Sequence, residues 1–272
     1  MPDNDLGLIA DAVRAAGQLA LTYWRRNPRS HLKADGSPVS EADIAVNDLL
    51  RDRLLSARPG YGWLSEESPD DPARLSARAV FILDPIDGTR AFLDGRSQFA
   101  HSVAVVRDGI VTAAAVHLPA EDLLYLAERD GPARLNDAPI AVSAATGLEG
   151  ASVLTSAAAQ KPEHWTDPAP SFTRVFRPSL AWRLCLVAEG RFDAVLSLRP
   201  AWEWDIAAGL LIAERAGATA TAATGAPIRF NAPDARTEGL IVAPPPVWAQ
   251  VRARLRTPVV PPPDSAAAAR RG

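Results

Sequence analysis

One junction in the sequence limits the local fold more than any other. Residues 79–83, with the sequence AVFIL, form a short and continuously apolar run, which is typical of a buried strand. The run stops at residues 84–89, with the sequence DPIDGT, where proline and glycine favour a loop and two aspartates interrupt the apolar character. The sequence therefore predicts a buried strand whose end opens into a loop, and this loop is the first place to look for chemistry.

Two helices and a meander are predicted around that strand. From Asp5 to about Arg26, apolar residues recur at spacings of three and four, and basic residues stand at the end, where they suit the helix dipole. Ser40 is predicted to be the N-cap of a second helix, with Asp43 at its third position. The segments 101–106 and 110–118 flank a turn sequence at 107–109, and the segment 123–128 alternates before a second turn sequence at 129–132, which predicts a β-meander. We expect a first lobe in which two helices cover an antiparallel sheet.

The second half of the chain alternates helices with strands. Helices are predicted for Leu180–Glu189 and Asp205–Ala216, and strands for Phe192–Leu198 and near residues 218–222 and 240–243. Weak periodicity over residues 143–178 places the join between two lobes there. The predicted divisions are an N-terminal α+β lobe at 1–145, a C-terminal α/β lobe at 146–256 and a disordered tail at 257–272.

The composition excludes several classes of protein. Of the 272 residues, 47% are hydrophobic and 22% are charged, and no apolar run approaches the roughly 20 residues of a membrane-spanning helix. A formal net charge of -3 leaves no basic surface suited to a nucleic-acid polymer. The single cysteine, Cys185, lies in an apolar helical run and is predicted to be a buried structural thiol. Since the first residues do not resemble a signal peptide, the cytoplasm is the expected compartment.

Five carboxylates stand at the ends of predicted elements, namely Glu66, Glu67, Asp84, Asp87 and Asp205. A carboxylate next to an apolar run is costly to bury unless a cation or a donor neutralises it, and converging oxygen ligands select Mg²⁺, Mn²⁺ or Ca²⁺. Pro85 fixes the backbone between Asp84 and Asp87, so both side chains and the Ile86 carbonyl could face one ion. The backbone amides of Gly88 and Thr89 could cradle a phosphate.

Each of these residues also has a structural explanation. Asp43 could improve the N-terminus of its helix, and Asp205 could cap the helix that follows it. Glu66 and Glu67 could be solvated loop residues, and Asp-Gly is a common turn pair. Residues 84–89 lack the alternating acids of the calcium-loop pattern, although a structural calcium module stays open as an alternative.

Taken together, these segments resemble the inositol monophosphatase family of metal-dependent, lithium-sensitive phosphatases. The resemblance covers about residues 5–250 and rests on the glutamate pair, DPIDGT, WDIAAG, and two further segments, at 66–67, 84–89, 204–209, 38–43 and 136–140. It implies an α/β fold, the layered α/β/α/β/α sandwich of the inositol monophosphatase and fructose-1,6-bisphosphatase superfamily.

The resemblance also implies a set of metal ligands. Glu66, Asp84 and the Ile86 carbonyl would bind one Mg²⁺, and Asp84, Asp87 and Asp205 would bind a second. A third, weaker ion would use Glu66, and Mn²⁺ could substitute for Mg²⁺. Two such ions would neutralise the phosphate oxygens, activate a water for in-line attack and stabilise the leaving alkoxide, so no covalent phosphoenzyme is required.

Further roles are implied for residues around the metal ligands. Glu66 and the Thr89 hydroxyl would orient the attacking water, with Thr89 paired to Asp43. Lys33 would offset the negative charge, although it could equally be a solvated loop lysine. The residues expected to contact the substrate are Lys33, Asp87, Gly88, Thr89, Arg183 and Asp205.

Residues of the predicted second lobe indicate which substrate is expected. Inositol-type members usually carry a glutamate seven residues before the aspartate of the Trp-Asp signature, where this chain has Leu198. Segments 61–67, 183–190 and 203–209 look most like the bacterial 3'(2'),5'-bisphosphate nucleotidase branch, which removes the 3'-phosphate of adenosine 3',5'-bisphosphate, a by-product of sulfate assimilation. Arg183 would then meet the second phosphate, and Trp202 would stack on the base.

Other functions stay open at this point. An inositol-1-monophosphatase or a histidinol-phosphate phosphatase would use the same ions and differ in the lobe that contacts the leaving group. A non-catalytic, metal-binding regulatory protein would keep the fold without turnover, but the complete carboxylate set argues against it. The expected partner is a small phosphorylated substrate, and the resemblance allows a homodimer as well as a monomer.

Overall fold

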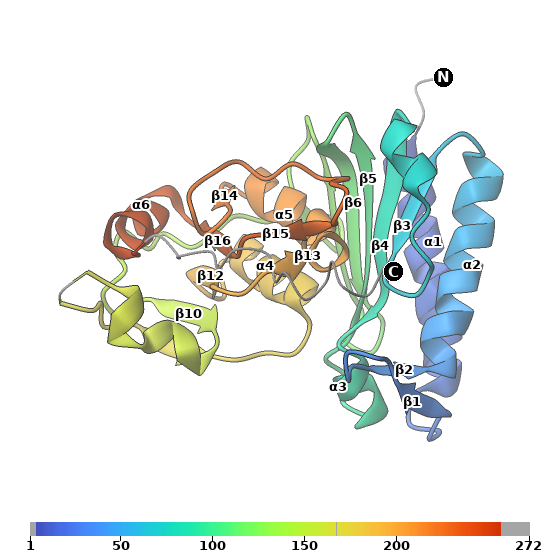
Figure 1. The fold of residues 1–272 in the computed structure, drawn as a ribbon, viewed down its shortest axis with the longest axis horizontal. Coiled ribbons are helices and arrows are strands. Elements are labelled where there is room, and N and C mark those ends of the chain that lie inside the picture. The colour runs from blue at the N-terminus through green and yellow to red at the C-terminus, as the bar shows by residue number, and fades with distance from the viewer. Residues whose placement is uncertain (1–3, 167, 257–272) are drawn as a thin grey trace, which may run out of the picture.

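The computed structural model describes residues 4–166 and 168–256, and the predicted tail at 257–272 lies outside them. The described chain stacks in five layers, which confirms the predicted α/β/α/β/α sandwich (Figure 1). The layers are α1 (Asp5–Tyr23) with α2 (Glu41–Ala57), a seven-stranded sheet, α4 (Leu180–Ala188) with α5 (Glu203–Arg215), a five-stranded sheet, and α6 (Pro245–Arg254). None of the helices in these two ranges is long and apolar enough to cross a membrane.

The outer helix pair follows the apolar periodicity, with one correction. α1 ends at Tyr23, so the expected basic end at Arg25 and Arg26 lies beyond it. Arg25 has a left-handed backbone with φ of 61°, which is incompatible with a continuing α-helix. Its side chain donates a hydrogen bond to the Gly95 carbonyl, a contact with a distant segment of the chain. α2 begins after Ser40, and the predicted capping box is confirmed: the Ser40 side chain accepts from the amide of Asp43, and the Asp43 carboxylate accepts from that of Ser40.

The first sheet contains the predicted meander and one parallel strand. Its strands, in spatial order, are β3 (Gly62–Ser65), β4 (Ala79–Asp87), β5 (Ala100–Arg107), β6 (Ile110–Leu118), β7 (Leu123–Glu128), β8 (Arg134–Leu135) and β9 (Ala138–Pro139). The meander from β5 to β7 is confirmed. β3 pairs in parallel with β4, so the expectation of a wholly antiparallel sheet is wrong. The segment between these strands, which includes the 3₁₀ turn Pro72–Ser76, returns the chain to the same end of the sheet, as a parallel pair requires.

β4 continues past the predicted end at Leu83 and carries a bulge among the candidate ligands. Opposite β5, Asp84 pairs with Ser102 and Asp87 pairs with Ala100, so β4 has one residue more than its partner over this span. In a regular strand, residues three apart point to opposite faces. Pro85 has no N–H to donate to the neighbouring strand. The extra residue at the bulge allows the side chains of Asp84 and Asp87 to lie on the same side of the sheet.

The second sheet lies beyond α4 and α5. Its spatial order is β11 (Thr173–Val175), β10 (Ser152–Thr155), β12 (Ala194–Ser197), β16 (Leu240–Ala243) and β14 (Thr219–Thr221). Two small pairs complete the fold, β1 (Ser30–Leu32) with β2 (Pro38–Ser40) and β13 (Ala201–Trp202) with β15 (Arg236–Thr237). The division at 145/146 stays a prediction, and it falls between β9 and β10.

The buried residues of the helix layer between the two sheets are apolar except for Glu203. Cys185 is completely buried in this layer, as predicted. The close approach of α4 and α5 requires a glycine, because a Cβ at Gly209 would lie 2.7 Å from Leu184 Cβ. This contact holds the N-terminus of α5, which carries Asp205, in a defined place against the first sheet.

Candidate active site

Three carboxylates from distant parts of the chain converge at one end of the first sheet. One oxygen each of Glu66, Asp84 and Asp205 lies within 4.8 Å of the others. Glu66 follows β3, Asp84 lies at the bulge of β4, and Asp205 lies in the first turn of α5. Burial, together with the negative charges of Glu66, Asp87 and Asp205, raises the pKa of Asp84 well above its ordinary value. Such mutual repulsion is relieved by a divalent cation, so these donors fit the hard ion expected from the sequence.

Asp87 is turned toward the second half of the chain. Its Oδ2 accepts hydrogen bonds from the Ser179 hydroxyl at 2.8 Å and from the Ala181 amide at 2.7 Å, at the start of α4. Burial raises the pKa of Asp87 to about 6, although these two donors and the positive charge of Arg183 oppose the change. Asp87 thus links the two halves of the chain through one oxygen. No local pattern predicts this link, because Ser179 is 92 residues away from Asp87 along the chain.

Thr89 and Asp43 are brought together beside the carboxylates. Thr89 Oγ1 lies 3.0 Å from Asp43 Oδ1 and 3.1 Å from the Ile86 carbonyl oxygen, both of which can accept its proton. Asp43 is 1% exposed, and burial raises its pKa, although the bonds from Ser40 and Thr89 oppose this. The structural and functional explanations of Asp43 therefore coexist, since one oxygen caps α2 and the other accepts from Thr89.

Lys33 lies in an ion-pair network and is not a solvated loop lysine. It sits at the end of the β1–β2 hairpin and donates to Glu66 Oε1 at 2.8 Å and to Glu67 Oε1 at 2.6 Å. Burial opposes its positive charge, but the bonds and charges of the two glutamates outweigh burial and raise the pKa of Lys33. Burial raises the pKa of Glu67 to about 7, which the Lys33 bond opposes. Lys33 thus partly neutralises the acidic end of β3.

The carboxylates form one wall of a cavity of about 550 Å³. Gly88 and Thr89 line it as well, so their backbone lies at the same cavity as the acidic groups. Its basic lining residues are Arg90, Arg96 and Arg183. Arg183 is half-buried, and the negative charges of Asp87 and Asp205 act on its guanidinium. The cavity therefore presents acidic and basic groups side by side.

Two residues used in the substrate argument lie elsewhere. The Trp202 ring stacks on Trp204 with centroids 4.6 Å apart, and the Arg236 guanidinium lies 3.9 Å from the Trp202 centroid. Trp202 does not line the cavity and its ring packs against these neighbours, so the structure does not support the prediction that it stacks on a base. Leu198 packs against the apolar cluster that contains Leu196 and Val247, and it does not line the cavity either.

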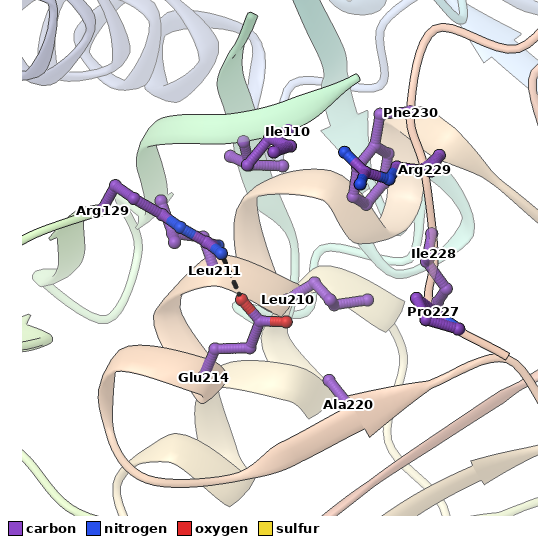
Figure 2. A pocket seen from close by; sticks show the side chains of 11 residues that line it. Ile110, Arg129, Leu210, Leu211, Glu214, Ala220, Pro227, Ile228, Arg229 and Phe230 are labelled. Atoms are coloured by element: carbon purple, nitrogen blue, oxygen red, sulfur yellow. Dashed lines mark hydrogen bonds and ion pairs between the residues drawn. The ribbon is translucent and has the colours of Figure 1, made fainter. Parts of the chain in front are cut away.

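A second cavity, of about 190 Å³, lies between β6 and the C-terminal part of α5. Figure 2 shows the ion pair that crosses it, in which Arg129 lies 3.2 Å from Glu214. Most of its lining is apolar, including Leu210, Leu211 and Phe230. A single paired carboxylate cannot replace the converging set at the first cavity, so the candidate active site is the cavity of Asp84 and Asp205.

Comparison with known proteins places this geometry in a family. A model of the inositol monophosphatase family matches residues 3–259. The chain is 37% identical to an inositol-1-monophosphatase of Rhizobium meliloti over 232 residues, which is 81% of this chain and 86% of the relative. It is 33% identical to a 3'-phosphoadenosine 5'-phosphate phosphatase of Mycobacterium leprae over 84% of each chain. It is 32% identical to a histidinol-phosphatase of Chlorobaculum parvum, over 78% of this chain and 83% of the relative.

Solved structures agree with the sequence comparison. A Thermotoga maritima IMPase superimposes with a TM-score of 0.80 at 27% identity, covering 92% of this chain and 96% of that one. The family match extends over all of the described residues and includes both halves that build the site. The chain therefore belongs to the inositol monophosphatase family.

Proposed function

We propose that this chain is a Mg²⁺-dependent phosphomonoester hydrolase whose preferred substrate is adenosine 3',5'-bisphosphate. The observation that carries the proposal is the convergence of Glu66, Asp84 and Asp205 within 4.8 Å at a cavity that also contains arginines. Carboxylates alone would repel a phosphate, whereas carboxylates that hold divalent cations attract it. The family and the named activities of its relatives support this reaction class.

The acidic residues of the cavity supply the metal-binding groups. Glu66, Asp84 and Asp205 offer the converging oxygens, and Asp87 contributes the oxygen that is not bonded to α4. The Ile86 carbonyl is the backbone donor of the set. Two or three Mg²⁺ ions would occupy the set, with Mn²⁺ as a substitute. When bound, they neutralise the phosphate oxygens and increase the acidity of the attacking water.

The remaining residues orient the reactants. Asp43 holds the proton of the Thr89 hydroxyl, so that a lone pair of Thr89 Oγ1 is left to accept a hydrogen bond from the attacking water. Glu66 accepts from the same water. Lys33 limits the repulsion between Glu66 and Glu67 and keeps the end of β3 in place. The backbone amides of Gly88 and Thr89 face the phosphate.

The arginines favour a substrate with a second phosphate. Arg183 is held by a 2.5 Å hydrogen bond from its Nε to the Arg177 carbonyl, which leaves its terminal nitrogens for an anion. Arg90 and Arg96 add positive charge at the same cavity. Inositol 1-phosphate has a single phosphate and uses fewer of these groups, and the amine of histidinol phosphate is repelled by them.

Steady-state phosphate release with Mg²⁺ tests the proposal. Adenosine 3',5'-bisphosphate, inositol 1-phosphate and histidinol phosphate are compared by kcat/KM, each with and without Li⁺. We expect a preference of about a hundredfold for the nucleotide, about 2.7 kcal/mol of discrimination, and inhibition by Li⁺. Preference for either other substrate contradicts the substrate assignment and leaves the reaction class intact. Absence of turnover with all three contradicts the hydrolase assignment.

A further inference from the structure

We propose that Phe176 is a specificity-determining residue whose ring stacks on the planar base of the substrate. This inference rests on the proposed nucleotidase function. Phe176 is 56% exposed, although a phenylalanine side chain normally gains from burial. It lines the same cavity as Asp84, Asp205 and Arg183. An exposed aromatic ring at the wall of a catalytic cavity is available to a ligand that brings its own flat surface.

The ring is connected to the carboxylates through short, well-defined contacts. β11 ends at Val175, directly before Phe176. Three residues later, Ser179 has a left-handed backbone with φ of 61° and bonds to Asp87 Oδ2. This unusual backbone is maintained because the Ser179 side chain both caps α4 and contacts the candidate metal ligand. The segment that carries Phe176 is therefore attached to the reacting end of the cavity.

Arg183 joins the ring to the acidic cluster. Its guanidinium carbon lies 4.6 Å from the centroid of Phe176, and its charge interacts with Asp87 and Asp205. Three kinds of group thus follow one another along the cavity wall: carboxylates, a guanidinium and an aromatic ring. A nucleoside bisphosphate offers the complementary order, with the reacting phosphate at the cations, the second phosphate at Arg183 and the base at Phe176.

Alternative ligands match this order less well. The inositol ring is puckered and carries a hydroxyl on every carbon without a phosphate, so it has no flat apolar face to stack. Trp202 cannot take the role, since Trp204 and Arg236 already pack on its ring. Phe176 is the aromatic side chain among the lining residues of this cavity, within the described part of the chain.

The test compares Phe176→Ala and Phe176→Trp with the wild type on adenosine 3',5'-bisphosphate and on inositol 1-phosphate, both with Mg²⁺. Stacking on a base contributes enough that its loss lowers kcat/KM about tenfold or more. We expect Phe176→Ala to show this loss for the nucleotide, mainly as a higher KM, and to leave inositol 1-phosphate within about twofold. Phe176→Trp, which restores a planar ring, should recover the nucleotide activity. Leu75→Ala, which truncates an exposed leucine that does not line this cavity, is the matched control and should resemble the wild type.

The outcomes separate this inference from the function on which it rests. If the wild type prefers inositol 1-phosphate, the nucleotidase proposal fails, and the role of Phe176 fails with it. If the wild type prefers the nucleotide and Phe176→Ala keeps that preference, only the stacking role is overturned. An equal loss on both substrates by Phe176→Ala also overturns it, because this would show a general disturbance of the cavity.

Discussion

The two carboxylate oxygens of Asp43 have different partners, one in the local fold and one in the candidate site. Oδ2 accepts from the Ser40 amide at 2.9 Å and completes the start of α2, whereas Oδ1 accepts from Thr89 at 3.0 Å. The residue is 1% exposed, so both bonds form away from bulk solvent, where an unpaired group is costly. A rigid helix terminus thereby fixes the direction of the Thr89 hydroxyl.

Replacement of Thr89 tests this positioning. Thr89→Val keeps the shape of the side chain and removes the hydroxyl that we propose to orient the attacking water, so we expect kcat to fall about a hundredfold or more. Thr89→Ser retains the hydroxyl and should stay within about tenfold of the wild type. Phosphate release under saturating substrate measures both, with circular dichroism to verify the fold. A Thr89→Val enzyme as active as Thr89→Ser would exclude a role for the hydroxyl.

At the scale of elements, the bulge in β4 is the feature that builds the acidic cluster. Without the extra residue opposite Ser102 and Ala100, Asp84 and Asp87 would point to opposite faces of the sheet. The neighbouring strand supports this shape, since the His101 ring on β5 is hydrogen-bonded through Nδ1 to the Pro85 carbonyl. The Pro85 carbonyl oxygen, which lies at the bulge, thus has a side-chain partner.

The buried His101 makes stability depend on pH. Burial lowers the pKa of His101 to about 3, from about 6.5 in an unfolded chain. The unfolded state therefore binds one more proton between these values, and the contribution to stability is complete above pH 6.5 and is lost as the pH falls toward 3. His101→Asn removes this proton uptake. Urea unfolding should show that the free energy of unfolding of the wild type falls by about 2 kcal/mol more than that of His101→Asn between pH 7 and pH 5. Equal losses would mean that His101 titrates normally in the folded protein.

Periodicity predicted the elements whose apolar faces are continuous. α1, α2, α4 and α5 and the strands β4 to β7 each bury a regular stripe or run, which a local pattern reveals. Local periodicity does not predict the hairpin of β1 and β2, because its strands have three residues each and β1 is exposed. β3 has four residues, and α6 buries only Val247 and Val251 among its residues. Such short or weakly amphipathic elements depend on their neighbours for stability.

At the scale of the whole molecule, the candidate site joins the two halves of the chain. Glu66 and Asp84 come from the first sheet and its loops, and Thr89 begins the short helix α3 (Thr89–Leu93) that follows β4. Asp205 and Ser179 come from the helix layer behind that sheet. The two signatures around Asp84 and Asp205 could be recognised in the sequence. Contacts such as Ser179 with Asp87, and the position of Phe176, depend on how α4 packs, so local patterns do not contain them.

The decisive measurement is phosphate release from adenosine 3',5'-bisphosphate by the wild type and Asp84→Asn as Mg²⁺ is titrated. We expect Asp84→Asn to lower turnover about a thousandfold or more at every Mg²⁺ concentration. Without metal, the variant should unfold at the same or a higher temperature than the wild type, because it removes one of several mutually repelling carboxylates. Loss of activity together with a retained fold would support the metal site. An Asp84→Asn enzyme with near-wild-type, Mg²⁺-dependent turnover would contradict it.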